Sequence, residues 1–252
     1  MRLLFKPPWL PPLGGRFGAP LGGRFRALAV DYDGTLAHDG QVDESTVGAL
    51  DRARKRGLRN LLVTGRELTS LFNAFEHTDL FDRVVAENGA VLYDPSTSAV
   101  DLLAGAPPPA FLRALERARV PFSVGHSIVA TVLPYDESML EIIRSLGLEW
   151  HLILNKRAVM ALPSVVTKAT GLSTALTALG VSADETVAVG DAENDLPFMQ
   201  ACGLAVAVDN ALPVVKDNAD VVMPAARGAG VELLVDRLLA GELDIVAHRP
   251  KR

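Results

Sequence analysis

The sequence predicts an α/β fold, with a doubly wound, parallel, Rossmann-like sheet and an inserted α+β cap domain. Short apolar runs alternate with helical stretches over residues 26–87 and again over residues 165–240, as in βαβ units. Polar residues follow several of these runs at the strand ends, where open α/β sheets bind ligands. Residues 88–164 break the alternation and indicate a separate unit of helices and antiparallel strands.

The first part of the core begins with the apolar run Ala27-Leu-Ala-Val30, which is typical of a strand covered on both faces. Similar runs recur after each helical stretch. We expect strands at 27–32, 58–63 and 83–86, and helices at 44–56 and 67–76.

The inserted unit starts with a hairpin-like segment and continues after Pro107-Pro-Pro109. Within it we expect helices at 110–119 and 137–146 and strands at 127–133, 150–154 and 158–162. The core then resumes with helices at 171–179, 193–201, 211–217 and 229–240 and strands at 186–190, 203–208 and 220–222.

Two carboxylates follow the first strand, in Asp31-Tyr-Asp33-Gly34-Thr35. Residues two apart on an extended chain face the same side, so both acids can approach one cation or one reacting group. Mg²⁺ prefers such oxygen ligands, and an Asp can attack phosphorus. On these residues alone, a tight turn after a core strand explains the pattern equally well.

Three later segments have the same character. Thr64-Gly65-Arg66 follows a strand and offers a hydroxyl and an amide to a phosphate, although Thr64 alone is explained as well by a helix cap. Lys168 stands just before a helix, where a lone lysine is ordinarily a surface residue. Gly190-Asp191-Ala-Glu-Asn194-Asp195 is an acidic loop after another strand, a composition that also suits an ordinary helix start.

In order, Asp-x-Asp-Gly-Thr, Thr-Gly-Arg, Lys and Gly-Asp-x-x-Asn-Asp resemble the motif set of the haloacid dehalogenase-like (HAD) hydrolase superfamily. The resemblance is greatest to its Cof-type, subclass IIB phosphatases and covers about residues 26–239. Glu87-Asn88-Gly89-Ala90 resembles the point at which the chain of that branch leaves the core. Ala169, Ala192 and a short cap depart from the usual pattern, and the short cap puts the substrate in doubt.

The resemblance implies a Mg²⁺-dependent phosphatase that hydrolyses a small phosphomonoester, a sugar phosphate or phosphoglycolate-like ester, through an aspartyl-phosphate. Asp31 would be the nucleophile and Asp33 the acid and base. The remaining roles it implies are phosphate binding by Thr64, Gly65, Lys168 and Asn194, metal binding by Asp31, Asp33 and Asp191, and support by Asp195 and Arg66.

Specificity is expected from the cap, because the core would contact only the phosphoryl group. The candidate substrate residues of the cap are Asn88, His126, Lys156 and Arg157. For His126 and the 155–157 connection, an exposed hairpin turn is the plainer explanation. The charges of the cap are nearly balanced and say little about the substrate.

Composition fits a soluble enzyme, and the resemblance implies a small phosphorylated metabolite as its partner. The chain has 252 residues, 49% hydrophobic residues and a net charge of −5, which argues against a dedicated nucleic-acid binder. No apolar run approaches the roughly 18 residues of a membrane helix. Scattered histidines argue against zinc, and the single Cys202 is expected to be buried in a reducing cytoplasm.

The two ends are expected to be tails. Residues 1–25 are rich in Pro, Gly and basic side chains and repeat Pro-Leu-Gly-Gly-Arg-Phe, and residues 241–252 read as flexible. The run Leu3-Leu4-Phe5 is too short for the apolar region of a signal peptide, and prolines follow it closely. A basic arm that touches an anionic surface, or a misassigned start, are the remaining explanations of the leader.

Two rival functions remain open at this stage. A phosphotransferase or phosphomutase on the same core would pass phosphate to a second molecule instead of water. A non-enzymatic, receiver-like domain also has a strand-end Asp, a Thr and a Lys, but such domains run about 120 residues without an insertion and lack the second acid. The sequence does not give the oligomeric state.

Overall fold

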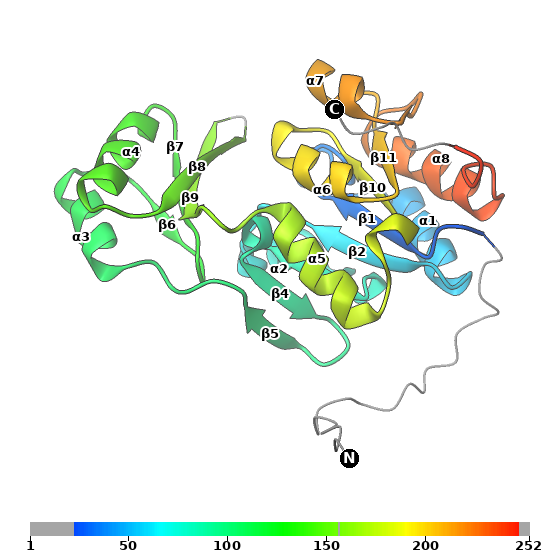
Figure 1. Cartoon of the computed structure of the whole chain (residues 1–252), viewed down its shortest axis with the longest axis horizontal. Coiled ribbons are helices and arrows are strands. Elements are labelled where there is room, and N and C mark those ends of the chain that lie inside the picture. The colour runs from blue at the N-terminus through cyan, green and yellow to red at the C-terminus, as the bar shows by residue number, and fades with distance from the viewer. Residues whose placement is uncertain (1–22, 156, 247–252) are drawn as a thin grey trace, which may run out of the picture.

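The computed structural model describes residues 23–155 and 157–246, in which an eight-stranded sheet forms the larger unit (Figure 1). Its strands are β1 (Ala27–Asp31), β2 (Arg59–Val63), β3 (Arg83–Ala86), β4 (Val91–Asp94), β5 (Ala99–Leu102), β10 (Thr186–Gly190), β11 (Leu204–Ala207) and β12 (Val221–Val222). The order is β12-β11-β10-β1-β2-β3-β4-β5, and the strands from β12 to β3 are parallel. The predicted doubly wound α/β sheet is confirmed.

Helices cover both faces of this sheet. They are α1 (Glu44–Lys55), α2 (Leu68–Ala74), α5 (Lys168–Leu179), α6 (Leu196–Ala201), α7 (Pro213–Asn218) and α8 (Arg227–Leu239). Helix α1 packs against α8, and α5 packs against α6. Strands β2 and β11 lie on opposite sides of the β1 and β10 pair, so right-handed crossovers place α1 and α6 on opposite faces.

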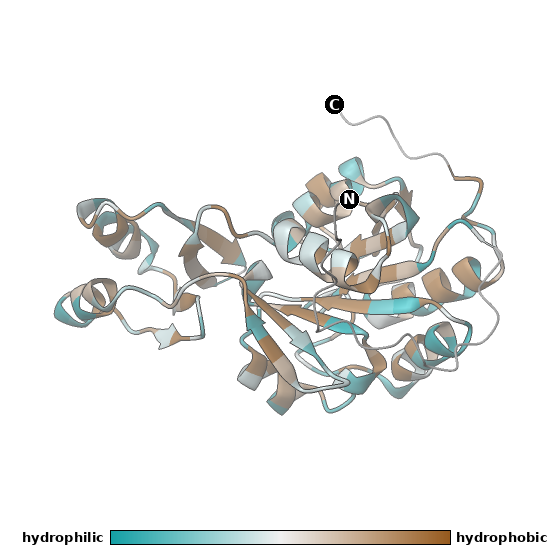
Figure 2. Ribbon diagram, turned by 60° about the horizontal axis from the view of Figure 1, so that its bottom comes forward, coloured by the Kyte–Doolittle hydropathy of each residue, from teal (hydrophilic) through white to brown (hydrophobic). Residues whose placement is uncertain are grey.

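The central strands are apolar because both of their faces are covered. Every residue of β1 and β10 is buried. Figure 2 shows the strands of the large sheet mostly in hydrophobic colours, whereas several helices alternate between hydrophobic and hydrophilic colours. This burial explains why the run at 27–30 lacks the polar alternation of a half-exposed strand.

The inserted unit, called the cap below, is a four-stranded antiparallel sheet with two helices. Its elements are α3 (Pro109–Arg117), β6 (Ser123–Val124), β7 (Val129–Val132), α4 (Asp136–Ser145), β8 (Trp150–Asn155) and β9 (Ala158–Pro163). The strand order is β6-β7-β9-β8. The cap has an apolar core of its own, made of Phe111, Leu115, Val120, Val129, Met139, Ile143, Val159 and Ala161. In Figure 1 it projects from one end of the larger unit.

The hairpin that was expected to open the cap belongs instead to the core. Strand β4 pairs antiparallel with β3, and β5 pairs antiparallel with β4, so both strands extend the large sheet. The order of apolar residues predicts a hairpin but not its partner, which here is the free edge of β3. The cap therefore begins after β5 and not at residue 88.

Several element boundaries also differ from the prediction. Helix α5 begins at Lys168, because the Thr167 hydroxyl accepts a hydrogen bond from the backbone N–H of Thr170 and caps the helix there. The helix expected at 193–201 is a 3₁₀ turn, η4 (Glu193–Asp195), followed by α6. Further 3₁₀ turns are η1 (Thr78–Leu80), η2 (Glu87–Gly89) and η3 (Ala183–Glu185).

The described ends of the chain pack against each other. The backbone N–H of Arg24 donates to Asp244, and the Arg24 guanidinium donates to the carbonyl of Val246. Phe25 and Leu243 are each 3% exposed. Residues 23–25 and 241–246 are therefore ordered parts of the core and not tails, while the rest of both predicted tails lies outside the described residues. Among the described helices, none has the length and apolar character needed to span a bilayer.

Candidate active site

The polar segments after the strands meet at the carboxyl edge of the large sheet. Asp31 ends the central strand β1, while Thr64 follows β2 and Asp191 follows β10, the strands on either side of β1. Parallel strands end side by side, so local sequence and strand order together bring these residues to one place. Lys168 joins them from the first turn of α5.

Lys168 is a buried cation between two carboxylates. It is 3% exposed, and its Nζ donates to Asp31 Oδ1 at 2.5 Å and to Asp195 Oδ1 at 2.6 Å. Although burial by itself lowers the pKa of Lys168, the charges of Asp195 and Asp31 hold that pKa above its ordinary value. Lys168 is thus a permanent positive charge beside Asp31, and not the surface residue that its isolated position in the sequence suggested.

Around Asp31, buried carboxylates outnumber buried cations. Burial and the charge of Asp195, with a smaller contribution from Asp191, raise the pKa of Asp31 to about 8, although Lys168 opposes the rise. One lysine cannot neutralise three neighbouring carboxylates. A further cation would relieve this excess and keep Asp31 ionised.

The acidic loop after β10 is braced by Asp195. Its Oδ2 accepts hydrogen bonds from the backbone N–H groups of Asp191 and Ala192, both at 3.0 Å, while its Oδ1 accepts from Lys168. A side chain at Gly190 would collide with Asp195, at 2.6 Å from its Cβ. Asp195 therefore fixes the loop, and its oxygens are already engaged by donors.

Asp191 is held on the opposite side by the loop after β1. Its Oδ1 accepts a hydrogen bond from the Thr35 hydroxyl at 3.2 Å. Gly34 has a φ of +97°, and a Cβ there would lie 2.2 Å from Asp191 Oδ2, so only glycine allows this approach. Thr35 was not among the predicted site residues, although its place in the first motif was the available signal.

A divalent cation fits this donor set. Asp31, Asp191 and Asp195 are buried and present carboxylate oxygens within 4.8 Å of one another. Hard oxygen ligands of this kind suit Mg²⁺. Because the oxygens of Asp195 accept from Lys168 and from backbone amides, Asp31 and Asp191 are the better placed ligands.

Asp33 and Arg66 form a bidentate ion pair that the sequence did not predict. Arg66 Nε donates to Asp33 Oδ2 and Arg66 Nη2 donates to Asp33 Oδ1, both at 2.7 Å. The guanidinium also lies over the ring of Tyr32, 5.0 Å from its centroid. Thr64 is fully buried, and its hydroxyl oxygen accepts from the backbone N–H of Arg66 at 3.1 Å. The helix cap of α2 is Glu67, so Thr64 does not have that role.

Asn88 joins three parts of the site. It is fully buried; its side-chain oxygen accepts from Asn194 at 3.2 Å, and its amide nitrogen lies 3.2 Å from the sulfur of Met160 in the cap. A Cβ on Gly65 would lie 3.1 Å from that amide. Asn88 therefore links the loop after β2, the acidic loop and the cap.

Glu87 connects the core to the cap. It is fully buried after β3, and its carboxylate accepts from the backbone N–H groups of His126, Ser127 and Ile128 at 2.9, 2.8 and 3.1 Å. The His126 ring lies 3.2 Å from the same carboxylate. Glu87 was not among the predicted site residues, although it follows a buried strand in the same way as the predicted acids.

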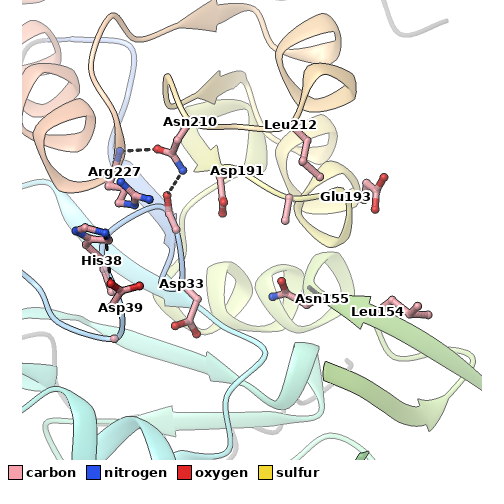
Figure 3. A pocket seen from close by; sticks show the side chains of 14 residues that line it. Asp33, His38, Asp39, Leu154, Asn155, Asp191, Glu193, Asn210, Leu212 and Arg227 are labelled. Carbon is pink, nitrogen blue, oxygen red and sulfur yellow. Dashed lines mark hydrogen bonds and ion pairs between the residues drawn. The ribbon is translucent and has the colours of Figure 1, made fainter. Parts of the chain in front are cut away.

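Two cavities lie between the core and the cap, and Asp33 and Asn155 line both of them. The first, of about 420 Å³, reaches from Asp33 past Asp191 to Glu193 (Figure 3). Asn210 fixes one wall of this cavity. Its Nδ2 donates to the carbonyl of Gly34 at 2.8 Å, and its Oδ1 accepts from the backbone N–H of Arg227 at 2.8 Å. Figure 3 shows Leu154 and Asn155 reaching this cavity from the cap.

The second cavity, of about 410 Å³, contains the predicted nucleophile. Asp31, Asp33 and Arg66 line it from the core, and Ile128, Ala130, Ala158 and Met160 line it from the cap. Of the predicted cap residues, Arg157 is exposed and lines neither cavity. His126 lies against Glu87 in a separate hollow. Lys156 lies outside the described residues. Asn155, the first residue of the 155–157 connection, lines both cavities.

The comparison with protein families gives one match. A family model described as haloacid dehalogenase-like hydrolase matches residues 28–104 and 154–234. The unmatched stretch between these two segments contains most of the cap. The chain is also 32% identical, over 221 residues, to a phosphoglycolate phosphatase of Methanothermobacter thermautotrophicus, across 85% of this chain and 99% of that relative.

Solved structures share the fold. A haloacid dehalogenase-like hydrolase from Bacteroides thetaiotaomicron superposes with a TM-score of 0.73 at 18% identity, across 85% of this chain and 99% of that one. A HAD subclass IIB sugar phosphatase superposes with a TM-score of 0.68 at 20% identity, across 84% of this chain and 98% of that one. At these identities the likeness concerns the fold, which includes the inserted cap.

Proposed function

We propose that this chain, which belongs to the haloacid dehalogenase-like hydrolase family and is a phosphoric monoester hydrolase, acts on phosphoglycolate or a similarly small phosphomonoester. A relative named for phosphoglycolate hydrolysis matches most of the chain, which supports this choice over a sugar phosphate. The observation that carries the proposal is the buried cluster of Asp31, Asp191 and Lys168, which borders a cavity containing Arg66.

Asp31 is proposed as the nucleophile. Its carboxylate oxygen forms a bond to phosphorus while the bond from phosphorus to the leaving alcohol breaks, which gives an aspartyl-phosphate. Water then attacks phosphorus and releases phosphate from Asp31. Lys168 orients the Asp31 carboxylate and balances part of its charge through the 2.5 Å contact.

Mg²⁺, held by Asp31, Asp191 and the carbonyl of Asp33, would supply positive charge to the phosphoryl oxygens. Asp33 is proposed to give a proton to the leaving oxygen and to take one from the attacking water. Thr64 can assist because its oxygen accepts from Arg66, which leaves its own hydroxyl hydrogen free to donate to a phosphoryl oxygen. The Gly65 amide and Asn194 complete the proposed phosphate contacts.

Hydrolysis is favoured over transfer to a second sugar. The cap lines the cavity that holds Asp31, Asp33 and Arg66, and we propose that this cavity also takes the leaving group. A receiver-like domain has no such insertion.

The test is phosphate release from phosphoglycolate, sugar phosphates and an aryl phosphate, with Mg²⁺ and with excess chelator. We expect release only with the divalent ion, and none from an Asp31→Asn variant. Asp101→Asn, which removes an exposed acid on β5, is the matched control and should retain full activity. Intact-mass measurement follows the covalent phosphate. Its appearance on the Asp31→Asn protein would place the nucleophile elsewhere.

A further inference from the structure

The bidentate pair of Asp33 and Arg66 conflicts with the role proposed for Asp33. Both carboxylate oxygens accept a hydrogen bond from the guanidinium at 2.7 Å. Bidentate pairs of this kind are among the strongest polar contacts in proteins. While the pair persists, each oxygen of Asp33 already accepts a hydrogen bond from Arg66, so the pair competes with a contact between Asp33 and a leaving group. A group that takes Arg66 away from Asp33 would remove this competition.

Arg66 is placed to exchange one partner for another. Its side chain is 24% exposed and that of Asp33 is 31% exposed, so neither is locked in the interior. The face of the guanidinium lies over Tyr32, which leaves the donors on its edge free to turn between acceptors. Gly40 lies beside Nη2, where a Cβ would approach to 3.3 Å, so the glycine leaves room for that motion.

The charges of the cavity show what can compete for Arg66. Arg66 is the one cationic side chain among the described residues that line the cavity with Asp31, and its other charged lining residues are Asp31, Asp33 and Glu67. The part contributed by the cap is apolar apart from Asn155. Apart from the neutral side chains of Ser70 and Asn155, an anionic group on the leaving alcohol would meet repulsion or apolar surface in this cavity, and Arg66 is the one cation that lines it among the described residues.

We propose that Arg66 recognises the carboxylate of the substrate and that this carboxylate displaces Asp33 from the guanidinium. This inference rests on the proposed function. It makes Arg66 the residue that selects the substrate class, which is short phosphomonoesters with a carboxylate on the leaving group. The released Asp33 then faces the leaving oxygen. Substrate binding energy is thereby used to complete the catalytic arrangement, so a carboxylate improves kcat as well as KM.

The test compares two esters of similar size. 2-Phosphoglycolate carries the carboxylate, whereas 2-hydroxyethyl phosphate replaces it with a neutral alcohol. We expect the wild-type enzyme to prefer phosphoglycolate in kcat/KM by on the order of 10²-fold, the range for a charged, bidentate contact. In Arg66→Gln this preference should fall to about threefold or less, chiefly through the loss on phosphoglycolate.

Arg113→Gln is the matched control, because it removes the same charge from an exposed position on α3 in the cap. It should retain the preference. Arg66→Lys keeps the charge and loses the planar fork, so we expect an intermediate preference. This second variant, with thermal unfolding of each protein, covers the case in which Arg66→Gln does not fold.

Three results would overturn the proposal. Equal kcat/KM for both esters in the wild-type enzyme would do so without any variant. An equal loss on both esters in Arg66→Gln, or an unchanged preference in Arg66→Lys if only that variant folds, would mean that Arg66 only positions Asp33. In these cases the phosphatase assignment stands. Release of phosphate from neither ester nor an aryl phosphate would instead refute the proposed function, and this inference with it.

Discussion

The carboxyl edge of the large sheet buries charged side chains, whereas the buried cluster of the cap contains none. At the sheet edge Asp31, Asp191, Asp195 and Lys168 are at most 7% exposed and engage one another or backbone amides. In the cap the buried cluster is entirely apolar. Buried charges need fixed partners, whereas an apolar cluster tolerates repacking. The chemistry and the charged contact from Arg66 are therefore tied to the rigid part, while the apolar surface beside the leaving group lies on the part that can vary.

The two regions meet at few buried polar contacts. Glu87 reaches from the core to three backbone amides of the cap, and Asn88 contacts Met160. Within the chain, the family match follows the same division, because it covers the core segments and omits residues 105–153. The two regions can be separated by experiment.

Removal of the cap should have the largest effect on selectivity. Leu103 donates its backbone N–H to Ala90, and a Cβ on the neighbouring Gly89 would lie 2.0 Å from the Thr167 carbonyl, so the cap's two connections lie close together. A short Gly-Ser linker in place of residues 105–164 should therefore keep the sheet intact. We expect discrimination in kcat/KM by the size and apolar character of the leaving group to fall by about 10- to 200-fold, with a smaller loss on an aryl phosphate, while the preference for a carboxylate that Arg66 provides remains.

The control for that experiment is a deletion that starts at residue 90. It would also remove β4 and β5 from the edge of the sheet, so we expect an insoluble protein. A folded capless enzyme that keeps the parent ranking would place specificity in the core loops.

Loss of the buried lysine tests the rigid side of the comparison. Lys168→Met leaves Asp31 and Asp195 without their shared cation, and we expect a cost of about 3–5 kcal/mol in the free energy of unfolding. Lys216→Met removes the partially exposed pair with Asp209 and should cost less than about 1 kcal/mol. Urea unfolding measures both. A Lys168 variant as stable as the Lys216 variant would contradict the assigned pairing.

The junction between the regions is tested at Glu87. Glu87→Gln keeps the shape but removes the charge that three amides share, so we expect a cost of about 1.5–3 kcal/mol. Glu67→Gln is the stability control, because Glu67 makes an exposed contact from core to cap with the Ser123 hydroxyl at 3.0 Å. Its effect on thermal unfolding should be near zero. Equal effects of Glu87→Gln and Glu67→Gln would show that the buried contacts of Glu87 contribute no more to stability than the exposed contact of Glu67.

Stability should also depend on pH and on the metal. The pKa of Asp31 rises from 3.8 to about 8 on folding without metal, so the folded state binds the extra proton between these values. Stability of the metal-free protein should therefore fall as pH rises from about 4 to 8. The raised pKa of Lys168 acts only at higher pH. Mg²⁺ should flatten this slope and raise the thermal midpoint at pH 8.

Asp31→Asn should remove the same slope in chelator, since the titrating group is gone. Thermal midpoints at pH 6, 7 and 8, in chelator and in Mg²⁺, measure all of these effects. A metal-free midpoint that rises toward pH 8 would assign the excess charge to another group.

Most of the core elements could be predicted because local signals define them. Apolar runs gave strands such as β1 and β10, and the alternation with helices gave their parallel order. The placement of the β4 and β5 hairpin could not be predicted, because its apolar pattern suits the edge of either sheet. The roles of the site residues remain proposals, although the structure brings Asp31, Thr64, Lys168, Asp191 and Asp195 to one edge.

Local sequence is enough to predict which side chains stand at strand ends, because strand length, glycine turns and polar residues are all local properties. How those side chains pair depends on the tertiary structure. Arg66 with Asp33, Glu87 with the amides of 126–128, and Lys168 with Asp31 join residues 33 to 137 positions apart. Such pairs depend on which strands lie side by side and on how the cap docks against the core. Both arrangements follow from burial over the whole chain, so no single segment determines them.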